Sequence, residues 1–252
     1  MKHSFKVFLA VIVACGTTLL DTADAHGYLK SPRSRNYHAN VEAVWWGATD
    51  NDPMPESDPQ SLNRGGTSAQ CGVVNGRNYD LPKNALGGLM TPTVQECYNK
   101  GSIIDVKVFL TAHHNGHFEF YACPISWGEI PTERCFKEHP LEFEEDVLYK
   151  APKDSNHPVR AYIPRQSTSG LGEFHYRYKL PAELTGELVL IQWYYITANT
   201  CTDEGYDKYP WPTGFGVDAG VPVCPLPMTG DGSEMPERVS RCLLSHSLFL
   251  LL

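Results

Sequence analysis

One histidine in this 252-residue sequence stands where a signal protease would leave it as the first residue of the mature chain. Residues 1–25 begin with a lysine-containing stretch, continue with an apolar run and end in Ala23-Asp24-Ala25, an A-x-A cleavage site. Cleavage there gives His26 a free α-amino group beside its imidazole. Because these two nitrogens can chelate one metal ion, the sequence predicts a secreted protein with a metal donor at its N-terminus.

Three more histidines, His113, His114 and His117, lie close together between two strand-like stretches. Alone they are weak evidence, since clustered histidines are more often surface or hydrogen-bonding groups. Combined with an N-terminal histidine, one of them completes a set of an amine and two imidazoles. Such a set favours Cu(II), where the affinity order of the divalent metals peaks. Zinc prefers a tetrahedral set, often with a carboxylate or thiolate.

Charge and cysteine content narrow the class of protein. The net charge of −8 argues against nucleic acid or an anionic membrane as partner. Seven cysteines remain after loss of the signal peptide and predict a disulfide framework with one cysteine left over. The best supported bridge joins Cys123 and Cys135, which a short excursion separates. Order along the chain suggests two further pairs, with the connectivity left open: Cys71/Cys97 and Cys201/Cys224.

The elements that must position these residues are strands. Helical periodicity is scarce, residues 36–70 have the composition of a long surface excursion, and the chain from 205 onward has that of an ordered loop. In the stretch Glu173–Tyr178 aromatic and charged residues alternate, which is typical of a half-buried antiparallel strand. The fold class predicted is an all-β, immunoglobulin-like or fibronectin-like antiparallel β-sandwich with long loops, stapled by disulfides. Its strands are expected at 103–110, 116–123, 159–163, 173–180 and 187–197.

The chain resembles the lytic polysaccharide monooxygenases. Its opening His26–Arg35, H-G-Y-L-K-S-P-R-S-R, is similar to their H-G-x-(L/V)-x-x-P-x-S-R start. Residues Thr111–Pro124 resemble the T-A-x-H-x-G-x-F-E-F-x-x-C-P pattern of auxiliary activity family fifteen, near the chitin-binding type-4-like branch. The segments Gln70–Gly72 and Leu190–Tyr194 match further stretches, so the resemblance covers most of 26–227. The implied organisation is a signal peptide (1–25), a catalytic domain (26–237) and an atypical C-terminal tail (238–252).

The resemblance implies a secreted, extracellular copper monooxygenase with one copper ion per chain. The amine and imidazole of His26 and the imidazole of His114 would hold the metal. Such enzymes take electrons from an external donor, use hydrogen peroxide or oxygen, and hydroxylate C1 or C4 of a sugar ring, which breaks the glycosidic bond. Chitin and cellulose are the implied substrates, with a pectic polymer left open, and we expect a monomer. The alternative is a non-catalytic secreted copper- or polysaccharide-binding protein with the same fold.

Several neighbours of the ligands carry two interpretations each. Gln192 and Tyr194 resemble a Q-x-Y pair that orients bound oxygen species, and the alternative is that they are buried polar residues of the core. His113 occupies the variable position before the ligand and is expected to be a solvated loop residue. His117 is expected to support the site or to lie at the surface.

Other residues near the expected site have less certain roles. Glu119 either delivers protons or, as we slightly favour, pairs with an arginine such as Arg35. Trp45 and Trp46 would either form a flat sugar-stacking surface together with Tyr28 and Tyr37 or plug the core.

The C-terminal end departs from the family pattern. The family places Tyr or Phe in the axial position of copper, a few residues before a Cys, whereas the stretch Pro236–Cys242 carries Val239 and no aromatic residue. Residues 243–252 do not resemble the expected closing strand. Three explanations compete: a genuine variant, a lipid-anchor signal, or a spliced or mistranslated end that does not represent the family, which we favour.

Overall fold

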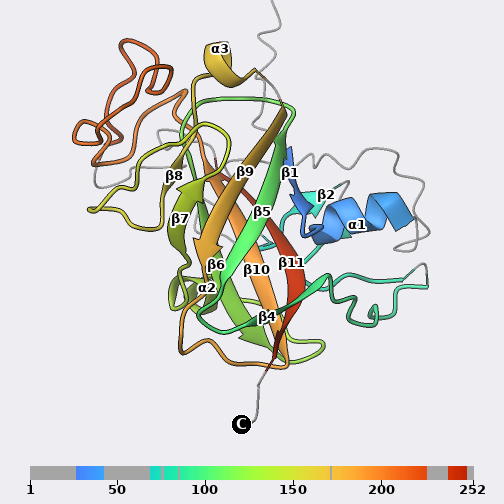
Figure 1. Ribbon diagram of the computed structural model, residues 1–252. Coiled ribbons are helices and arrows are strands. Elements are labelled where there is room, and N and C mark those ends of the chain that lie inside the picture. Colours follow the sequence, from blue (N-terminus) through green and yellow to red (C-terminus); the bar gives the residue numbers. More distant parts are fainter. Residues whose placement is uncertain are drawn as a thin grey trace, which may run out of the picture.

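The computed structural model of the chain describes residues 27–42, 69–74, 77–84, 86–170, 172–225 and 238–248. The signal segment 1–25, His26, Trp45 and Trp46 lie outside the described residues. Two sheets of mostly antiparallel strands face each other (Figure 1), which confirms the predicted all-β sandwich. The elements in chain order are β1 (Gly27–Ser31), α1 (Arg35–Glu42), β2 (Val73–Val74), β3 (Arg77–Asn78), β4 (Glu96–Asn99), β5 (Ile103–Leu110), β6 (His117–Ile125), α2 (Glu133–Lys137), β7 (Glu142–Asp146), β8 (Ala161–Tyr162), α3 (Gln166–Ser169), β9 (Gly172–Lys179), β10 (Leu188–Ile196) and β11 (Arg238–Leu248).

The strand order explains which segments lie side by side. One sheet has the order β1-β5-β9-β7 and the other the order β4-β11-β10-β6-β8, while β2 and β3 form a small separate ribbon. Only β4 and β11 pair in parallel among the described strands. Consequently β1 lies next to β5, and β10 lies between β6 and β11.

Alternating side chains fill the space between the sheets. Phe174, Tyr176 and Tyr178 of β9 are almost fully buried, as their spacing predicted. Phe118 of β6 lies at the centre of an aromatic cluster, where its ring meets four others at near right angles. Edge-to-face pairs of this kind add stability beyond the area they bury, so this cluster holds the two sheets together.

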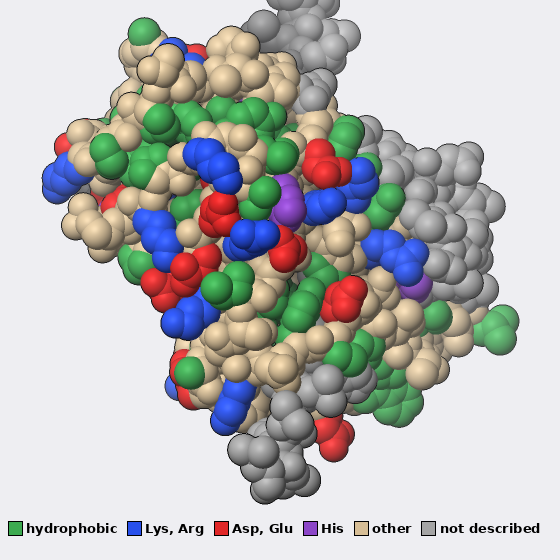
Figure 2. Space-filling model, viewed as in Figure 1, with side chains coloured by type: hydrophobic (Ala, Val, Ile, Leu, Met, Phe, Trp, Pro, Cys, Tyr) green, Lys and Arg blue, Asp and Glu red, His purple; other side chains and the backbone are tan. Residues whose placement is uncertain are grey.

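The outer face of the four-stranded sheet is charged (Figure 2), and acidic and basic side chains alternate across it. Asp105 contacts His175 and Arg177, and Arg177 also contacts Glu145. These groups are largely exposed, so each pair contributes little to stability. The face is therefore a solvated surface.

Some expectations from the sequence are wrong. The segment 36–70 is not entirely an irregular excursion, because α1 runs from Arg35 to Glu42. The C-terminal stretch Arg238–Leu248 is a strand paired along β10, although its sequence does not resemble a closing strand. Backbone hydrogen bonds to β10 and β4 on either side compensate for its weak pattern. The expected strands at 103–110, 116–123, 159–163, 173–180 and 187–197 correspond to β5, β6, β8, β9 and β10.

The disulfides also differ in part from expectation. Cys123–Cys135 and Cys201–Cys224 are confirmed, but Cys71 pairs with Cys242 and not with Cys97. The reason is that β11 brings Cys242 beside residues 69–72, while Cys97 is exposed and free on β4. No helix in the described ranges is long and apolar enough to cross a membrane.

Candidate metal centre

The loop His113–Gly116, which we call the ligand loop, joins β5 to β6 at one end of the sandwich. Two successive residues, Asn115 and Gly116, adopt positive φ angles of 56° and 100°. Asn tolerates this conformation better than most residues, and Gly adopts it freely. Gly116 is required here for a second reason, because a Cβ atom would lie 2.1 Å from the carbonyl oxygen of Ile196. The sequence Asn-Gly thus turns the chain directly after His114.

The backbone of His114 is held from β10 and the segment after it. Its N–H donates to the hydroxyl of Tyr195 at 2.9 Å, and its carbonyl accepts from the N–H of Ala198 at 2.9 Å. The same Tyr195 hydroxyl donates to the carbonyl of Asn115 at 2.9 Å. Because Tyr195 is itself buried in the core, it fixes the loop relative to the sheet.

The ring of His114 differs from its neighbours. Its Nε2 atom is shielded from water, and no hydrogen-bond partner reaches it among the described residues. A buried polar atom without a partner is costly and rare, and a bound ion or water is one of the ordinary explanations for it. A neutral imidazole nitrogen is also the common metal ligand of proteins. The atom therefore fits a metal ion.

His113 is not the solvated loop residue that the sequence suggested. It is 6% exposed, and both ring nitrogens have partners. Nδ1 accepts from the N–H of Asn115 at 3.1 Å, and Nε2 lies 3.2 Å from the hydroxyl of Ser169. Burial lowers the pKa of His113 to about 4, so the ring is neutral at physiological pH. With its nitrogens engaged, His113 is a structural group.

His117 is fully buried and therefore not a surface residue. On the outer side of β6 it forms a row with Glu119 and Tyr121, which we call the β6 polar row. One oxygen of Glu119 lies 3.2 Å from Nε2 of His117, and the other accepts from the hydroxyl of Tyr121. Nδ1 of His117 meets the hydroxyl of Tyr206. Every ring nitrogen of His117 thus has a protein partner.

Glu119 does pair with an arginine, but with Arg160 at 3.6 Å and not with Arg35. Arg35 instead donates to the carbonyls of Tyr79 and Asp80. Burial by itself raises the pKa of Glu119, yet the hydrogen bonds from His117 and Tyr121 overcome this and hold the pKa at about 2. The carboxylate is therefore ionised and occupied in holding the row together.

Strand β1 begins beside the ligand loop. Gly27 is paired with Leu110, four residues before His114. A side chain at position 27 would clash, because a Cβ would lie 2.7 Å from the carbonyl oxygen of Phe109 and 2.9 Å from the side chain of Leu110. His26 is bonded to Gly27, so it is attached at the strand end next to this loop.

A polar hollow of about 670 Å³, open to solvent, lies beside His114. Asn115 donates from its side-chain amide to Asp218 at 3.2 Å within it. The lining residues come from the ligand loop, from the start of α3 and from the loop after β10: His113, His114, Asn115, Arg165, Gln166, Ser167, Asn199 and Asp218. None of them is Phe, Tyr or Trp, so a molecule bound here would be held mainly by hydrogen bonds.

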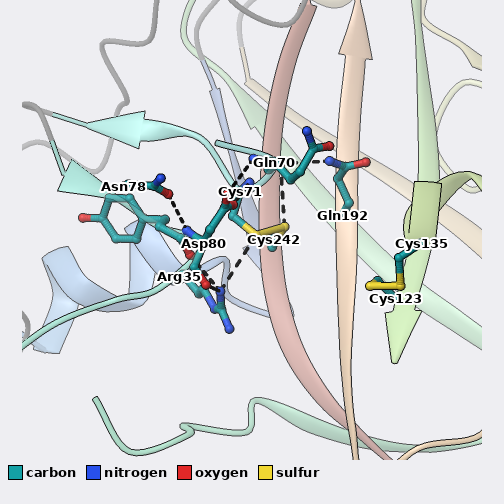
Figure 3. The surroundings of a disulfide bond; sticks show 10 residues. Arg35, Gln70, Cys71, Asn78, Asp80, Cys123, Cys135, Gln192 and Cys242 are labelled. Atoms are coloured by element: carbon teal, nitrogen blue, oxygen red, sulfur yellow. Dashed lines mark hydrogen bonds between the residues drawn. A yellow bond between two sulfur atoms is a disulfide. The ribbon is translucent and has the colours of Figure 1, made fainter. Parts of the chain in front are cut away.

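Gln192 and Tyr194 lie away from this hollow, on the face of β10 opposite to Tyr195. The amide of Gln192 donates to the carbonyl of Gln70 at 2.8 Å, beside the Cys71–Cys242 disulfide (Figure 3). The ring of Tyr194 packs with that of Tyr121. The structure therefore brings neither residue to His114.

The two described aromatic residues of the expected sugar surface do come together. Tyr28 stacks on Tyr37 with ring centroids 4.6 Å apart, and on Phe109 at 5.5 Å. All three rings are half-buried on the outer side of β1 and β5. Neither tyrosine belongs to the buried core between the sheets.

The register of β11 locates the position where an axial aromatic was expected. Val239 pairs with Tyr195, the residue whose hydroxyl holds the ligand loop. The backbone at position 239 thus passes close to the site, while the sequence supplies an aliphatic residue there.

Among the described residues, no three His, Cys, Asp or Glu side chains gather as a ligand set. His114 would therefore need donors from another part of the chain. Comparison with known proteins indicates what kind of site this is, because residues 26–208 match the family model described as lytic polysaccharide mono-oxygenase, cellulose-degrading. The chain belongs to the lytic polysaccharide monooxygenase family. Members of this family are copper enzymes that oxidise polysaccharides.

One of the similar solved structures supports the fold. The lytic polysaccharide monooxygenase AA15 from Thermobia domestica in the Cu(I) state is similar with a TM-score of 0.54 and 23% identity, over 88% of this chain and 98% of that one. The cellulose-active CelS2 in complex with copper scores 0.38 at 14% identity, over 87% and 97%. A chitin binding domain from Burkholderia pseudomallei scores 0.38 at 12%, over 89% and 100%. No curated protein sequence matches the chain.

Sequence reasoning missed the residues that support the lytic polysaccharide monooxygenase site. Tyr195, Asn115 and Ser169 each fix the ligand loop through one or two hydrogen bonds. The Asn-Gly pair after His114 was a visible turn signal. No local signal marks Tyr195 or Ser169, because their partners lie 81 and 56 positions away.

Proposed function

We propose that this chain is a secreted copper monooxygenase that oxidatively cleaves glycosidic bonds in a polysaccharide, chitin or cellulose, by hydroxylation at C1 or C4. The amine and imidazole of His26 and Nε2 of His114 would hold one copper ion. The observation that carries the proposal is Nε2 of His114, which is shielded from water, has no partner among the described residues and belongs to the loop beside the start of β1. An amine and two imidazoles are a donor set that copper prefers.

Copper held this way would supply the redox chemistry, drawing electrons from an external donor and using hydrogen peroxide or oxygen. The protein contributes geometry. Tyr195 fixes the position of the ligand loop relative to β10 through two hydrogen bonds. Gly27 lets β1 approach β5 closely. The open hollow beside His114 leaves room for a sugar chain.

The proposal gives different roles to the pair Tyr28 and Tyr37 and to the pair Gln192 and Tyr194, because the two pairs lie in different places. Tyr28 and Tyr37 form a stacked, half-exposed pair on the outer side of β1, which suits them to contact sugar rings. Gln192 and Tyr194 hold the sheet to residues 69–72 and to Tyr121, so the proposal assigns them to packing and gives them no step in the reaction. Secretion follows from the signal segment 1–25, and the expected form is a monomer.

The first test compares the chain that begins at His26 with one that carries a single extra glycine before it. Calorimetric titration with Cu(II) and the Cu(II) spin-resonance spectrum are measured for both. The extra residue turns the amine into an amide, so we expect tight binding to be lost. His114→Ala should lose it too, whereas the control His175→Ala, which changes a histidine on the outer sheet face, should not. An unchanged spectrum in the extended chain would contradict the assignment.

The second test is mass spectrometry of material released from chitin, cellulose and pectin by the copper-loaded protein with a reductant. Oxidised oligosaccharides from chitin or cellulose are the expected result, and the position of oxidation distinguishes C1 from C4. Tight copper binding without such products would indicate a non-catalytic copper-binding protein instead.

A further inference from the structure

The hollow beside His114 has one wall that belongs to a different part of the chain. Arg165, Gln166 and Ser167 enter it from the start of α3, about 50 residues beyond the ligand loop. They provide a cation, an amide and a hydroxyl, which are groups that bind the hydroxyls of sugars. Their usefulness depends on how firmly α3 is held relative to His114.

Hydrogen bonds hold this segment at both ends. At its start, the backbone N–H of Arg165 donates to the carbonyl of Gly214 at 2.9 Å, and its guanidinium donates to the carbonyl of Val217 at 2.7 Å. At its end, the hydroxyl of Ser169 lies 3.2 Å from Nε2 of His113. Within the segment, only the Ser169 contact reaches the ligand loop; two residues before the segment, the N–H of Ile163 donates to the carbonyl of Gly116 in that loop at 3.1 Å.

The imidazole ring of His113 connects the ligand loop to the end of α3. Because Nδ1 accepts from the N–H of Asn115, the proton of the neutral ring lies on Nε2, which then donates to Ser169. The ring is buried, so the surrounding side chains restrict its movement. One side of the imidazole shapes the turn after His114, and the other side holds α3.

We propose that His113 is a positioning residue that holds the segment Arg165–Ser169 at a fixed distance from His114 and so sets how the polysaccharide is gripped. The part concerning the polysaccharide rests on the proposed function, whereas the coupling of α3 to the ligand loop does not. His113 neither binds the metal nor touches the reacting atoms, since both of its nitrogens serve the protein.

Two substitutions separate the two sides of the ring. In His113→Asn the amide oxygen can take the place of Nδ1, so the turn at Asn115 is kept and the contact with Ser169 is lost. In His113→Gln the longer amide can reach Ser169 in place of Nε2, while the acceptor for Asn115 is lost. Ser169→Ala removes the same contact from the other partner, and His175→Asn is the matched control on the outer sheet face.

The experiment uses the processed chain that begins at His26. Hydrogen exchange of the copper-free protein is followed at residues 168–170, whose N–H groups donate to the carbonyls of Arg165 and Gln166. We expect exchange there to rise about tenfold in His113→Asn and in Ser169→Ala, the change that corresponds to loss of one hydrogen bond. His113→Gln and His175→Asn should resemble the wild type at these positions. Equal exchange in His113→Asn and the wild type would overturn the coupling.

The substrate part is read from saturation kinetics on the polysaccharide that the wild type oxidises, and from Cu(II) spin resonance. His113→Asn should raise KM about tenfold with little change in kcat and an unchanged spectrum, since the copper ligands stay in place. His113→Gln should change the spectrum instead, and a KM equal to wild type in His113→Asn would overturn the gripping role. If the wild type binds no copper, the proposed function fails, while the exchange result still decides the coupling.

Discussion

The ligand loop and the β6 polar row are adjacent in the sequence, yet they treat buried imidazoles in opposite ways. In the row, His117 has a protein partner at each ring nitrogen, and Glu119 and Tyr121 continue the chain of hydrogen bonds. In the loop, His113 is equally satisfied, but Nε2 of His114 has no partner among the described residues. Since burying an unpaired polar atom costs free energy, the comparison favours His114 over its two neighbours as the proposed metal ligand.

The largest effect should come from Gly116, which separates the two regions. Gly116→Ala forces a Cβ to within 2.1 Å of the carbonyl of Ile196 and places a non-glycine residue at a φ of 100°. We expect a loss of about 4 kcal/mol in the free energy of unfolding, measured by urea denaturation. Gly87→Ala, at a positive φ with nothing nearby, provides the control and should lose only about 1 kcal/mol. Similar losses in both variants would show that the turn is not tightly packed.

The second prediction concerns acid stability of the polar row. The pKa of Glu119 is held at about 2, below its ordinary 4.5, so its carboxylate stabilises the fold above pH 4.5. This contribution, about 3 kcal/mol, should be lost as the pH falls from 4.5 toward 2. Glu119→Gln should remove this part of the pH dependence and destabilise the protein at neutral pH by about 2 kcal/mol. Copper affinity should remain, because the row does not contact His114. A large loss of affinity would show that the polar row and the ligand loop are energetically coupled.

A smaller pair of changes compares one hydroxyl in each region. Tyr195→Phe removes both hydrogen bonds to the ligand loop and should cost about 1–2 kcal/mol. Since it supports a ligand, it should also weaken copper binding about tenfold. Tyr121→Phe removes the hydroxyl that donates to Glu119 and should cost about 1 kcal/mol with no effect on copper. Thermal denaturation and copper titration of both variants would show the contrast, and equal copper affinities would contradict it.

The smallest effect is expected at the exposed end of the row. Lys137 donates to the hydroxyl of Tyr121 at 3.0 Å and lies 4.3 Å from the centre of its ring. Lys137→Met should cost about 0.5 kcal/mol, because an exposed cation gains little from an aromatic face. It should also shift the acid transition assigned to Glu119 slightly upward, since a positive charge near the carboxylate is lost. A shift in the opposite direction would contradict the assignment of that transition.

The sequence was sufficient where local pattern and burial agree. Phe174, Tyr176 and Tyr178 alternate with charged residues, and the strand they predicted is present with those rings inside. The ligand role of His114 was predicted from the family resemblance, and Nε2 of His114, which has no partner among the described residues, is consistent with that prediction. In these cases the residue types and their spacing in the sequence are enough to predict where each side chain lies.

It was insufficient where a residue's environment comes from distant segments. His113 looked like a solvated loop residue, but Ser169 and the α3 segment cover it. Glu119 needed an arginine, and nothing local distinguishes Arg160 from Arg35. The stretch Arg238–Leu248 lacks a clear strand pattern in its sequence. It is nevertheless a strand, because it pairs with β4 on one side and with β10 on the other. Tertiary context outweighs local propensity there.

The disulfide between Cys71 and Cys242 is the less favourable of two possible pairings of Cys71 in the unfolded chain. Those cysteines are 171 positions apart, whereas Cys97 is 26 positions from Cys71. Loop-closure entropy favours the shorter ring in an unstructured chain by about 1.7 kcal/mol, or roughly fifteenfold. Oxidation of the unfolded chain would therefore favour the wrong ring, and thiol exchange after β11 has paired with β10 would be needed to correct it. The fraction of chains with the native bridge then depends on whether β11 pairs before Cys71 is oxidised.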